Sequence, residues 1–342
     1  MGFRFQNFGN AVSETNNKNK LTGYLVKIIL VFTVLIALFY VTNRLIAPQV
    51  VEHTQPVIGE IQQPASDSSQ SDDGEIGGEK KLNEAERPPK IIDFLSAKVI
   101  ESAEHPIDPL MKLADYSLGV MDEKYQDYSA KIFSQVRTNI LNEETSMFVK
   151  LRHARKQDDA EVPFSIYTRF LSPQSQVGVE AIWVKGQNDG NILGHTTGLW
   201  NVKTIPLAPE SHYAMKGNRY PIYQLGLRNL LLKMKEFGEN DRKYDECTVE
   251  VQHNLMVDDR KCIRLVITHP KKRDHFEYHI AKIYIDPELE IPIGYEGFLW
   301  PEKEGDEPPL LERYIYQELK FNCGLEDVDF DTSNPDYDYP RY

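Results

Sequence analysis

Residues 246–269 read ECTVEVQHNLMVDDRKCIRLVITH, and this stretch decides the fold class. Two runs rich in valine, leucine, isoleucine and threonine flank the pair Asp258-Asp259, a pattern that is typical of a β-hairpin. The stretch therefore predicts two neighbouring antiparallel strands.

This hairpin also bears on the three cysteines, Cys247, Cys262 and Cys323, which form no CxxC pair. Their spacing argues against a zinc ribbon or a thioredoxin-like redox site. A turn at 258–259 places Cys262 opposite Leu255 rather than Cys247, so this register does not favour a disulfide between the two. An odd number of cysteines leaves at least one free thiol.

Further β-like runs lie on both sides of the hairpin, at 126–138, 145–155, 163–171, 180–186, 191–196, 275–286, 291–300 and 311–321. The Asn-Asp-Gly cluster at 188–190 marks another hairpin turn. The absence of a helical pattern between most consecutive runs argues against a parallel doubly wound sheet. We predict an α+β fold with one large antiparallel sheet.

Two amphipathic helices interrupt the strand pattern. The first follows Pro106 and has apolar residues at three- and four-residue spacing: Ile107, Leu110, Met111, Ala114, Leu118 and Met121. In the second, Pro221 is the expected first helical residue and Gly238 the expected C-terminal cap. Its apolar side carries Tyr223, Leu227, Leu230, Leu231, Met234 and Phe237. We expect both helices to cover one face of the sheet.

An apolar run near the N-terminus predicts a membrane anchor. Residues 25–41 read LVKIILVFTVLIALFYV, and with snorkelling Lys27 and Arg44 the run is about 20 residues long, enough to span a bilayer. Basic residues precede it and acids follow from Glu52 onward, so the N-terminus is expected in the cytoplasm. A cleaved signal peptide is the alternative, but no clear small-x-small cleavage site follows the run.

These features divide the chain into four parts. We predict a cytoplasmic tail at 1–23, a transmembrane signal-anchor helix at 24–47, a disordered linker at 48–90 and a globular domain at 91–342. The linker is rich in Pro, Gln, Ser, Asp, Glu and Gly and buries too little apolar surface to offset its ordering entropy.

Charge and motifs exclude several functions. A balance of 39 Lys and Arg against 52 Asp and Glu gives a net charge of -13, which disfavours nucleic acid as a partner. The chain contains no GxSxG, GxxxxGK[ST], GxGxxG or HExxH motif, which lowers the expectation of an enzyme. A hydrolase stays open as an alternative on its scattered histidines and acids. No cofactor is predicted.

Two groups of polar residues suggest metal sites only weakly. His275 and His279 share one face of a predicted strand with Glu277, but at 3.4 Å per residue the histidines lie about 13 Å apart, too far for one zinc ion. We interpret them as a solvated polar face.

The acidic C-terminus has calcium-loop spacing at Asp327, Asp329, Asp331 and Asp338, but Thr332 replaces the required glycine. A solvated tail is the preferred interpretation, with weak calcium binding as the alternative.

Alternating aromatic residues suggest either an ordinary core or a ligand cavity. The chain has 18 Tyr, 15 Phe and 3 Trp, and many fall at every second position of predicted strands. If the helices only partly fill a concave sheet, the remaining cavity is lined by Phe164, Ile166, Phe170, Phe276, Tyr278 and Ile280.

Six stretches, in this order, resemble the DUF1571 family of bacterial proteins of unknown function: HPIDPLMKLAD, PFSIYTRFLSP, EAIWVKGQNDGNILGH, AMKGNRYPI, THPKKRDHFEYHIAKIYID and LKFNCGLEDVDFDTSNPDYDYP. The resemblance covers about residues 105–340, and AMKGNRYPI, Ala214 to Ile222, is its most specific part. The family implies a bacterial envelope, with the domain in the periplasm and the anchor in the inner membrane.

More distantly, Pro163 to Pro173, Ile285 to Pro292 and Leu319 to Phe330 are similar to LolA/LolB-type lipoprotein carriers. That likeness implies an unclosed half-barrel capped by helices, with acyl chains on its inner face. This chain differs in being tethered to the membrane. The functional arginine of the carriers cannot be placed here, because Arg152, Arg155 and Arg169 are all candidates.

Together these observations predict a membrane-anchored, non-catalytic envelope protein that binds a lipid or a lipidated protein in a half-barrel cavity. The helix with Tyr223, Leu227, Leu230, Leu231 and Met234 is its expected lid. The alternative is a module that uses the same fold to bind a protein partner or to sense the envelope.

Overall fold

The computed structural model describes residues 58–60, 90–198 and 201–341, all of which belong to one compact unit. Its strands are β1 (Ile58–Glu60), β2 (Asp127–Val136), β3 (Thr145–Arg152), β4 (Arg155–Gln157), β5 (Ala160–Val162), β6 (Ser165–Ser172), β7 (Glu180–Val184), β8 (Ile192–His195), β9 (Ile205–Leu207), β10 (Thr248–Val257), β11 (Arg260–Thr268), β12 (Ile280–Asp286), β13 (Ile291–Phe298) and β14 (Leu310–Phe321). Its helices are η2 (Ile91–Phe94), α2 (Ala97–Glu101), α3 (Asp108–Lys124), η3 (Asn188–Gly190), η5 (Ile222–Gln224), α4 (Leu227–Asp241) and η6 (Asp327–Phe330).

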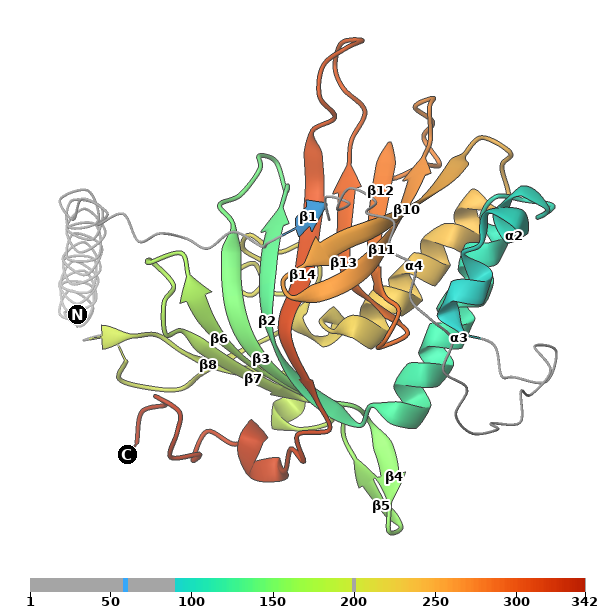
Figure 1. Cartoon of the computed structure of the whole chain (residues 1–342). Coiled ribbons are helices and arrows are strands. Elements are labelled where there is room, and N and C mark those ends of the chain that lie inside the picture. The colour runs from blue at the N-terminus through green and yellow to red at the C-terminus, as the bar shows by residue number, and fades with distance from the viewer. Residues whose placement is uncertain (1–57, 61–89, 199–200, 342) are drawn as a thin grey trace, which may run out of the picture. The chain divides into compact units, whose positions relative to one another are not determined.

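Twelve of the described strands form one antiparallel sheet in the order β1-β10-β11-β12-β13-β14-β2-β3-β6-β7-β8-β9. Strands β4 and β5 form a separate hairpin (Figure 1). The order is linear and β1 and β9 are its two ends, so the sheet does not close into a barrel. The prediction of a large, unclosed antiparallel sheet is confirmed.

The hairpin quoted at the outset has the predicted register. Val257 pairs with Arg260 and Leu255 with Cys262, across a turn in which Asp258 has a positive φ of 58°. Cys247 lies outside this ladder, and all three cysteines are free.

Helices α3 and α4 lie side by side on one face of the sheet, which we call the inner face (Figure 1). The periodicity after Pro106 correctly predicted α3, whose buried Leu110 and Leu113 pack with Leu265 and Ile283 of the sheet. Most of the space between the helices and β11–β13 is therefore occupied by apolar side chains, which include the ring of Tyr295.

The second helix differs from its prediction at both ends. It begins at Leu227, after Gly226, whereas Pro221 starts the separate short helix η5. It continues past Gly238 to Asp241. A Cβ atom at Gly238 would lie 2.5 Å from the Met111 sulfur, so this glycine lets α3 and α4 approach closely rather than ending the helix.

The predicted strand at 275–286 begins only at Ile280. The ring of His275 stacks on Tyr244 with centroids 3.6 Å apart, and that of Phe276 stacks on His269 at 3.8 Å. These contacts hold residues 275–279 in a loop, so the predicted strand is wrong there, although burial still alternates: Phe276 and Tyr278 are buried and Glu277 is exposed. Among the described residues, no group of three His, Cys, Asp or Glu side chains could hold a metal ion.

The remaining half of the inner face is covered by residues 208–226, which join β9 to α4 and which we call the covering segment. Its residues Ala214, Ile222, Tyr223 and Leu225 pack on the apolar cluster of the inner face. Helices and covering segment together leave little of this face open.

The opposite, outer face of β3, β6 and β7 is covered by residues 322–341, which we call the C-terminal segment (Figure 1). Its buried residues Leu325, Phe330, Tyr337 and Tyr339 pack with Tyr167, Ile182 and Val184 of the sheet. The expectation of a solvated tail is therefore wrong, because alternating aromatic residues in this segment bury against the sheet.

Two expectations concern the N-terminal quarter. The predicted tail and anchor, residues 1–47, lie outside the described residues, and no helix among the residues that are described is long and apolar enough to cross a membrane. Within the predicted linker, Ile58–Glu60 form β1 and pair with β10, which corrects the linker prediction at these three residues.

Candidate ligand-binding pocket

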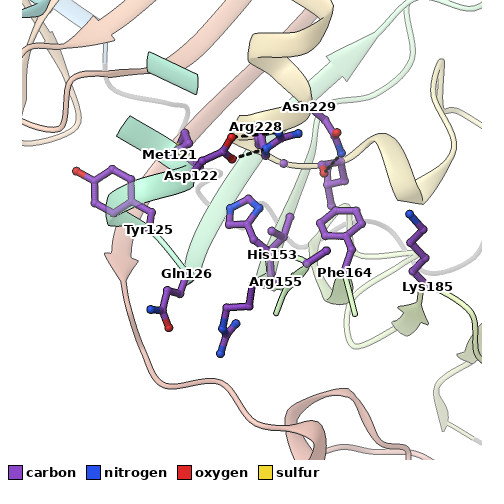
Figure 2. A pocket seen from close by; sticks show the side chains of 14 residues that line it. Met121, Asp122, Tyr125, Gln126, His153, Arg155, Phe164, Lys185, Arg228 and Asn229 are labelled. Carbon is purple, nitrogen blue, oxygen red and sulfur yellow. Dashed lines mark hydrogen bonds and ion pairs between the residues drawn. The ribbon is translucent and has the colours of Figure 1, made fainter. Parts of the chain in front are cut away.

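A pocket of about 470 Å³ opens at the end of the inner face, where α3 ends and α4 begins (Figure 2). Pockets of this size can hold small ligands or part of a lipid. Its lining comes from the end of α3, the β3–β4 connection, the residues next to β6 and β7, and the start of α4: Met121, Asp122, Tyr125, Gln126, Leu151, His153, Ala154, Arg155, Phe164, Lys185, Leu225, Gly226, Arg228 and Asn229.

The floor of the pocket is apolar. Met121 and Leu151 are fully buried, and Phe164 makes an edge contact with Trp183 at 5.9 Å. Together with Leu225 they belong to the apolar cluster of the inner face. The floor therefore continues into the core beneath the covering segment.

Gly226 brings the first turn of α4 onto β3. It has a φ of 115°, and a Cβ atom there would lie 2.5 Å from a methyl carbon of Leu151. The Tyr128 hydroxyl accepts a hydrogen bond from the Leu227 amide at 2.9 Å and so fixes this turn. No side chain caps the helix at Gly226, which leaves its N-terminal end at the pocket.

The wall of the pocket carries four charged side chains. Arg228 donates two hydrogen bonds to the Asp122 carboxylate, at 2.7 and 3.3 Å. Arg155 donates to the side-chain oxygen of Gln157, and its buried Nη1 has no hydrogen-bond partner within the described structure. The fourth, Lys185, is exposed.

His153 lies at the centre of the pocket, parallel to the ring of Phe164 (Figure 2). Burial, followed by the charge of Arg228, lowers the pKa of His153 to about 4, so the ring is neutral at pH 7. Its buried Nε2 has no hydrogen-bond partner among the described residues. A ligand atom in the pocket could satisfy this nitrogen.

The structure places the six predicted cavity residues in separate regions. Phe164, Ile166 and Phe170 share the apolar cluster under the covering segment, and only Phe164 lines the pocket. The other three, Phe276, Tyr278 and Ile280, belong to the loop before β12 and its first residue, where Tyr278 donates a hydrogen bond to Asp241 of α4. These six residues do not line one cavity.

The predicted lid residues all contact the inner face. Leu227 and Leu231 are fully buried, while Leu230 and Met234 are half-buried against the sheet. Tyr223 lies in η5, where its ring contacts Trp183 at 5.8 Å. Movement of these residues as a lid stays a prediction.

The covering segment is fixed to the sheet by the AMKGNRYPI stretch. The Arg219 guanidinium lies 3.0 Å from the carboxylate of Glu312 and 2.7 Å from that of Glu277, and the Tyr220 hydroxyl donates to Glu312 at 3.1 Å. Glu312 is 2% exposed, and burial raises its pKa although Arg219 opposes the rise. We call this set of contacts the latch.

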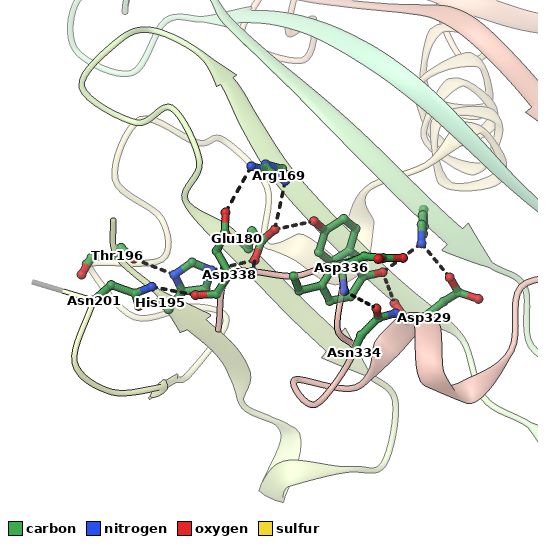
Figure 3. Close-up of polar contacts among 12 residues, drawn as sticks. Arg169, Glu180, His195, Thr196, Asn201, Asp329, Asn334, Asp336 and Asp338 are labelled. Atoms are coloured by element: carbon green, nitrogen blue, oxygen red, sulfur yellow. Dashed lines mark hydrogen bonds and ion pairs between the residues drawn. The ribbon is translucent and has the colours of Figure 1, made fainter. Parts of the chain in front are cut away.

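A second polar cluster lies on the outer face (Figure 3). Glu180 accepts hydrogen bonds from Tyr167 at 2.7 Å and from the Asp338 backbone amide at 2.9 Å. It also lies 2.8 Å from His195 Nε2 and 3.8 Å from the Arg169 guanidinium. Burial alone would raise the pKa of Glu180, but these hydrogen bonds lower it. The side chains of Glu180 and His195 are both fully buried, so the cluster anchors the C-terminal segment rather than facing a ligand.

Three of the four acids with calcium-loop spacing take part in the same anchoring. Asp327 pairs with Arg152 at 2.8 Å, Asp329 with Lys150 at 2.6 Å, and Asp338 with Arg169 at 3.2 Å. Of the three candidate arginines, Arg152 and Arg169 therefore bind this segment on the outer face.

Arg155 is the one of those three arginines that lines the pocket. The sequence did not predict His153, Lys185 or Arg228 as pocket residues. His153 and Lys185 each follow the last residue of a strand, β3 and β7, and Arg228 is the second residue of α4. The available signal was the glycine before α4, since it permits the close approach that forms the pocket.

The DUF1571 model, described as a protein of unknown function, matches residues 125–339. No curated protein matches the chain. Similar solved structures include a DUF1329 family protein from Desulfovibrio piger, 14% identical, covering 66% of this chain and 98% of its own, with a TM-score of 0.34. A putative outer membrane lipoprotein-sorting protein domain from Vibrio parahaemolyticus is 11% identical. The match covers 65% of this chain and 95% of that domain, with a TM-score of 0.32.

A LolA superfamily protein from Nitrosomonas europaea is 11% identical and covers 64% of this chain and 97% of its own, with a TM-score of 0.25. The match of the family model over most of the sheet and the C-terminal segment confirms the resemblance noted from the sequence, and the chain belongs to the DUF1571 family.

Proposed function

We propose that this protein binds a hydrophobic ligand, a lipid or a lipid-modified protein, at the end of its inner face without catalysing a reaction. The observation that supports this most directly is the pocket of about 470 Å³ whose apolar floor continues into the core under the covering segment. An acyl chain placed on Leu151 and Phe164 would remain in contact with apolar side chains along its length.

The covering segment gives this site a way to enlarge. Beneath it lie Ile166, Phe170 and Trp183, which would accommodate more of an acyl chain if the segment moved away from the sheet. The latch, together with the lid residues of α4, would control that movement. In the proposed opening, the apolar surface under the covering segment would become accessible from the pocket.

The pocket chemistry favours binding over catalysis. Its lining contains no Ser, Thr or Cys nucleophile, and its one carboxylate, Asp122, is engaged by Arg228. No carboxylate among the described residues is hydrogen-bonded to His153 to orient it as a general base. A hydrolase is therefore less well supported than a binding protein.

The proposed setting is the cell envelope. The apolar run at 24–47 would anchor the protein in the inner membrane with its N-terminus in the cytoplasm, and the residues around 48–90 would tether the domain in the periplasm. A hydrophobic ligand would then be exchanged close to the membrane surface.

One observation favours a second function, the binding of a protein partner. Ile140 and Tyr213 are 71% and 78% exposed, on two loops that a hydrogen bond from Asn142 to the Gly217 carbonyl connects. Exposed apolar side chains on neighbouring loops are common in protein interfaces. This function would leave the pocket empty.

Photolabelling of the full-length protein in nanodiscs with a diazirine-bearing palmitic acid tests the proposal. We expect labelled peptides around residues 151–155, 164 and 225–229. Ala154→Trp should fill the pocket from its exposed rim and abolish the label, whereas Ala160→Trp, also at an exposed position but on β5 outside the pocket, should not. Equal labelling of both variants, or no label in these peptides, would contradict lipid binding at this site.

A further inference from the structure

The charge of the pocket is opposite to that of the chain. The protein carries a net charge of -13, yet the pocket is lined by Arg155, Lys185 and Arg228 against the single carboxylate of Asp122. Asp122 is already engaged by Arg228. Arg155 and Lys185 have no ion pair with a carboxylate among the residues that the structure describes, so the pocket has an excess of two positive charges.

The start of α4 adds a backbone contribution. The Leu227 amide is engaged by Tyr128, but the amides of Arg228 and Asn229 belong to the first turn, where a helix supplies no acceptor. The helix dipole places a partial positive charge at the same end. The N-cap residue, Gly226, has no side chain that could cap this end. The helix that follows it is 15 residues long.

Two buried nitrogen atoms in the pocket have no partner in the described structure, Nε2 of His153 and Nη1 of Arg155. A buried donor without an acceptor costs about 1–3 kcal/mol, which a ligand oxygen would recover. A neutral histidine can donate from Nε2, and an arginine donates from every nitrogen. Both atoms therefore favour a ligand that offers several acceptor oxygens.

From this arrangement we infer that the pocket binds the anionic headgroup of an amphiphile, a phosphate monoester or a carboxylate, whose acyl chain lies on the apolar floor. The headgroup contacts Arg155, Lys185, the first turn of α4 and His153, while Leu151 and Phe164 hold the first part of the chain. This assignment rests on the proposed function and specifies its ligand class. A neutral headgroup would leave the two cations and the buried nitrogens without acceptors.

The test is competition with the photolabel on the full-length protein in phosphatidylcholine nanodiscs. Dodecyl phosphate, monolauroylglycerol and inorganic phosphate are compared as competitors, with free concentrations measured. We expect dodecyl phosphate to halve the pocket label at a concentration at least tenfold lower than monolauroylglycerol. Higher salt should reduce this preference, because the cations are partly exposed.

Two variants of equal charge locate the effect. Arg155→Gln with Lys185→Gln should abolish the preference for the phosphate. Lys156→Gln with Lys216→Gln removes two exposed cations outside the pocket and should retain it. If the first variant fails to fold, Lys185→Gln alone, at an exposed position, should still weaken the preference.

The possible outcomes separate the two proposals. Equal competition by dodecyl phosphate and monolauroylglycerol would overturn the anionic headgroup and leave lipid binding intact. Inorganic phosphate as effective as dodecyl phosphate would show a site for free anions and overturn the amphiphile. A pocket that takes no label and responds to no competitor would contradict the proposed function itself.

Discussion

At the scale of single residues, the pocket is defined by a glycine that allows close packing and by a histidine that has a buried polar atom. Gly226 is needed because its backbone conformation and the contact with Leu151 leave no room for a side chain. His153 is instead held neutral, and its buried Nε2 has no hydrogen-bond partner among the described residues, which costs stability that a ligand atom would recover. The glycine thus shapes the pocket by close packing, whereas the histidine leaves a buried polar atom that the proposed ligand would contact.

Gly226→Ala should lower the free energy of unfolding by roughly 2–4 kcal/mol, through backbone strain and overpacking against Leu151. Gly305→Ala is a matched control, since its φ of 93° is equally unfavourable but its Cβ would meet nothing. We expect a loss of about 1 kcal/mol there. Urea denaturation of both variants measures the difference; equal losses would mean that the contact with Leu151 is unimportant.

The pKa of His153 predicts a pH dependence of stability. The folded-state pKa is about 4 and the unfolded value 6.5, so only the unfolded chain takes up a proton between these values. Stability should therefore fall as the pH drops from about 6.5 towards 4, by at most about 3 kcal/mol from this group. His153→Gln should remove that part of the pH dependence, measured by urea denaturation at several pH values. An unchanged profile would mean that His153 titrates normally.

At the scale of elements, sequence periodicity located most strands and α3, because alternation and three-to-four spacing reflect burial directly. Periodicity failed where contacts between residues far apart in the sequence determine the local structure. Gly238 resembles a helix cap but lies within α4, where it lets α3 approach closely. Residues 275–279 alternate like a strand, but their rings stack on Tyr244 and His269. The pocket also escaped prediction, because its polar residues come from connections that have no period.

The C-terminal segment was mispredicted for the same reason, and its packing can be measured. Tyr337→Ala removes a ring stacked on Tyr167 at 4.1 Å and a hydroxyl bonded to Lys150 and to the Asp329 carbonyl. We expect a loss of roughly 2–4 kcal/mol in urea denaturation. Hydrogen exchange should also increase in the segment.

Tyr213→Ala, at a tyrosine that is 78% exposed, should change stability by less than about 0.5 kcal/mol and serves as the control. A similar small effect for Tyr337→Ala would show that the C-terminal segment contributes little to stability.

At the scale of the whole molecule, the covering segment links the pocket to the rest of the inner face. It is fixed at one place by the latch, whose carboxylate Glu312 is buried, and at another by Asn142. Breaking a buried ion pair leaves an uncompensated charge, so the latch is where the segment is most sensitive to change.

Arg219→Gln should release the covering segment. We expect faster hydrogen exchange across residues 208–226 and spread of the palmitic acid label to peptides that contain Ile166, Phe170 and Trp183. Arg242→Gln removes a more exposed ion pair, with Asp108, and should change neither measurement. Unchanged exchange in the Arg219 variant would contradict a role for the latch in opening the inner face.

The strand order also has a consequence in time. Within β2–β9, and again within β10–β14, most strands pair with the strand that is next to them in sequence. The ladder between β14 and β2 joins these two groups of strands. The last residue of that seam in the β14 ladder is Phe321, which pairs with Tyr128. During synthesis the early strands must therefore wait, with one edge unpaired, until nearly the entire polypeptide has left the ribosome.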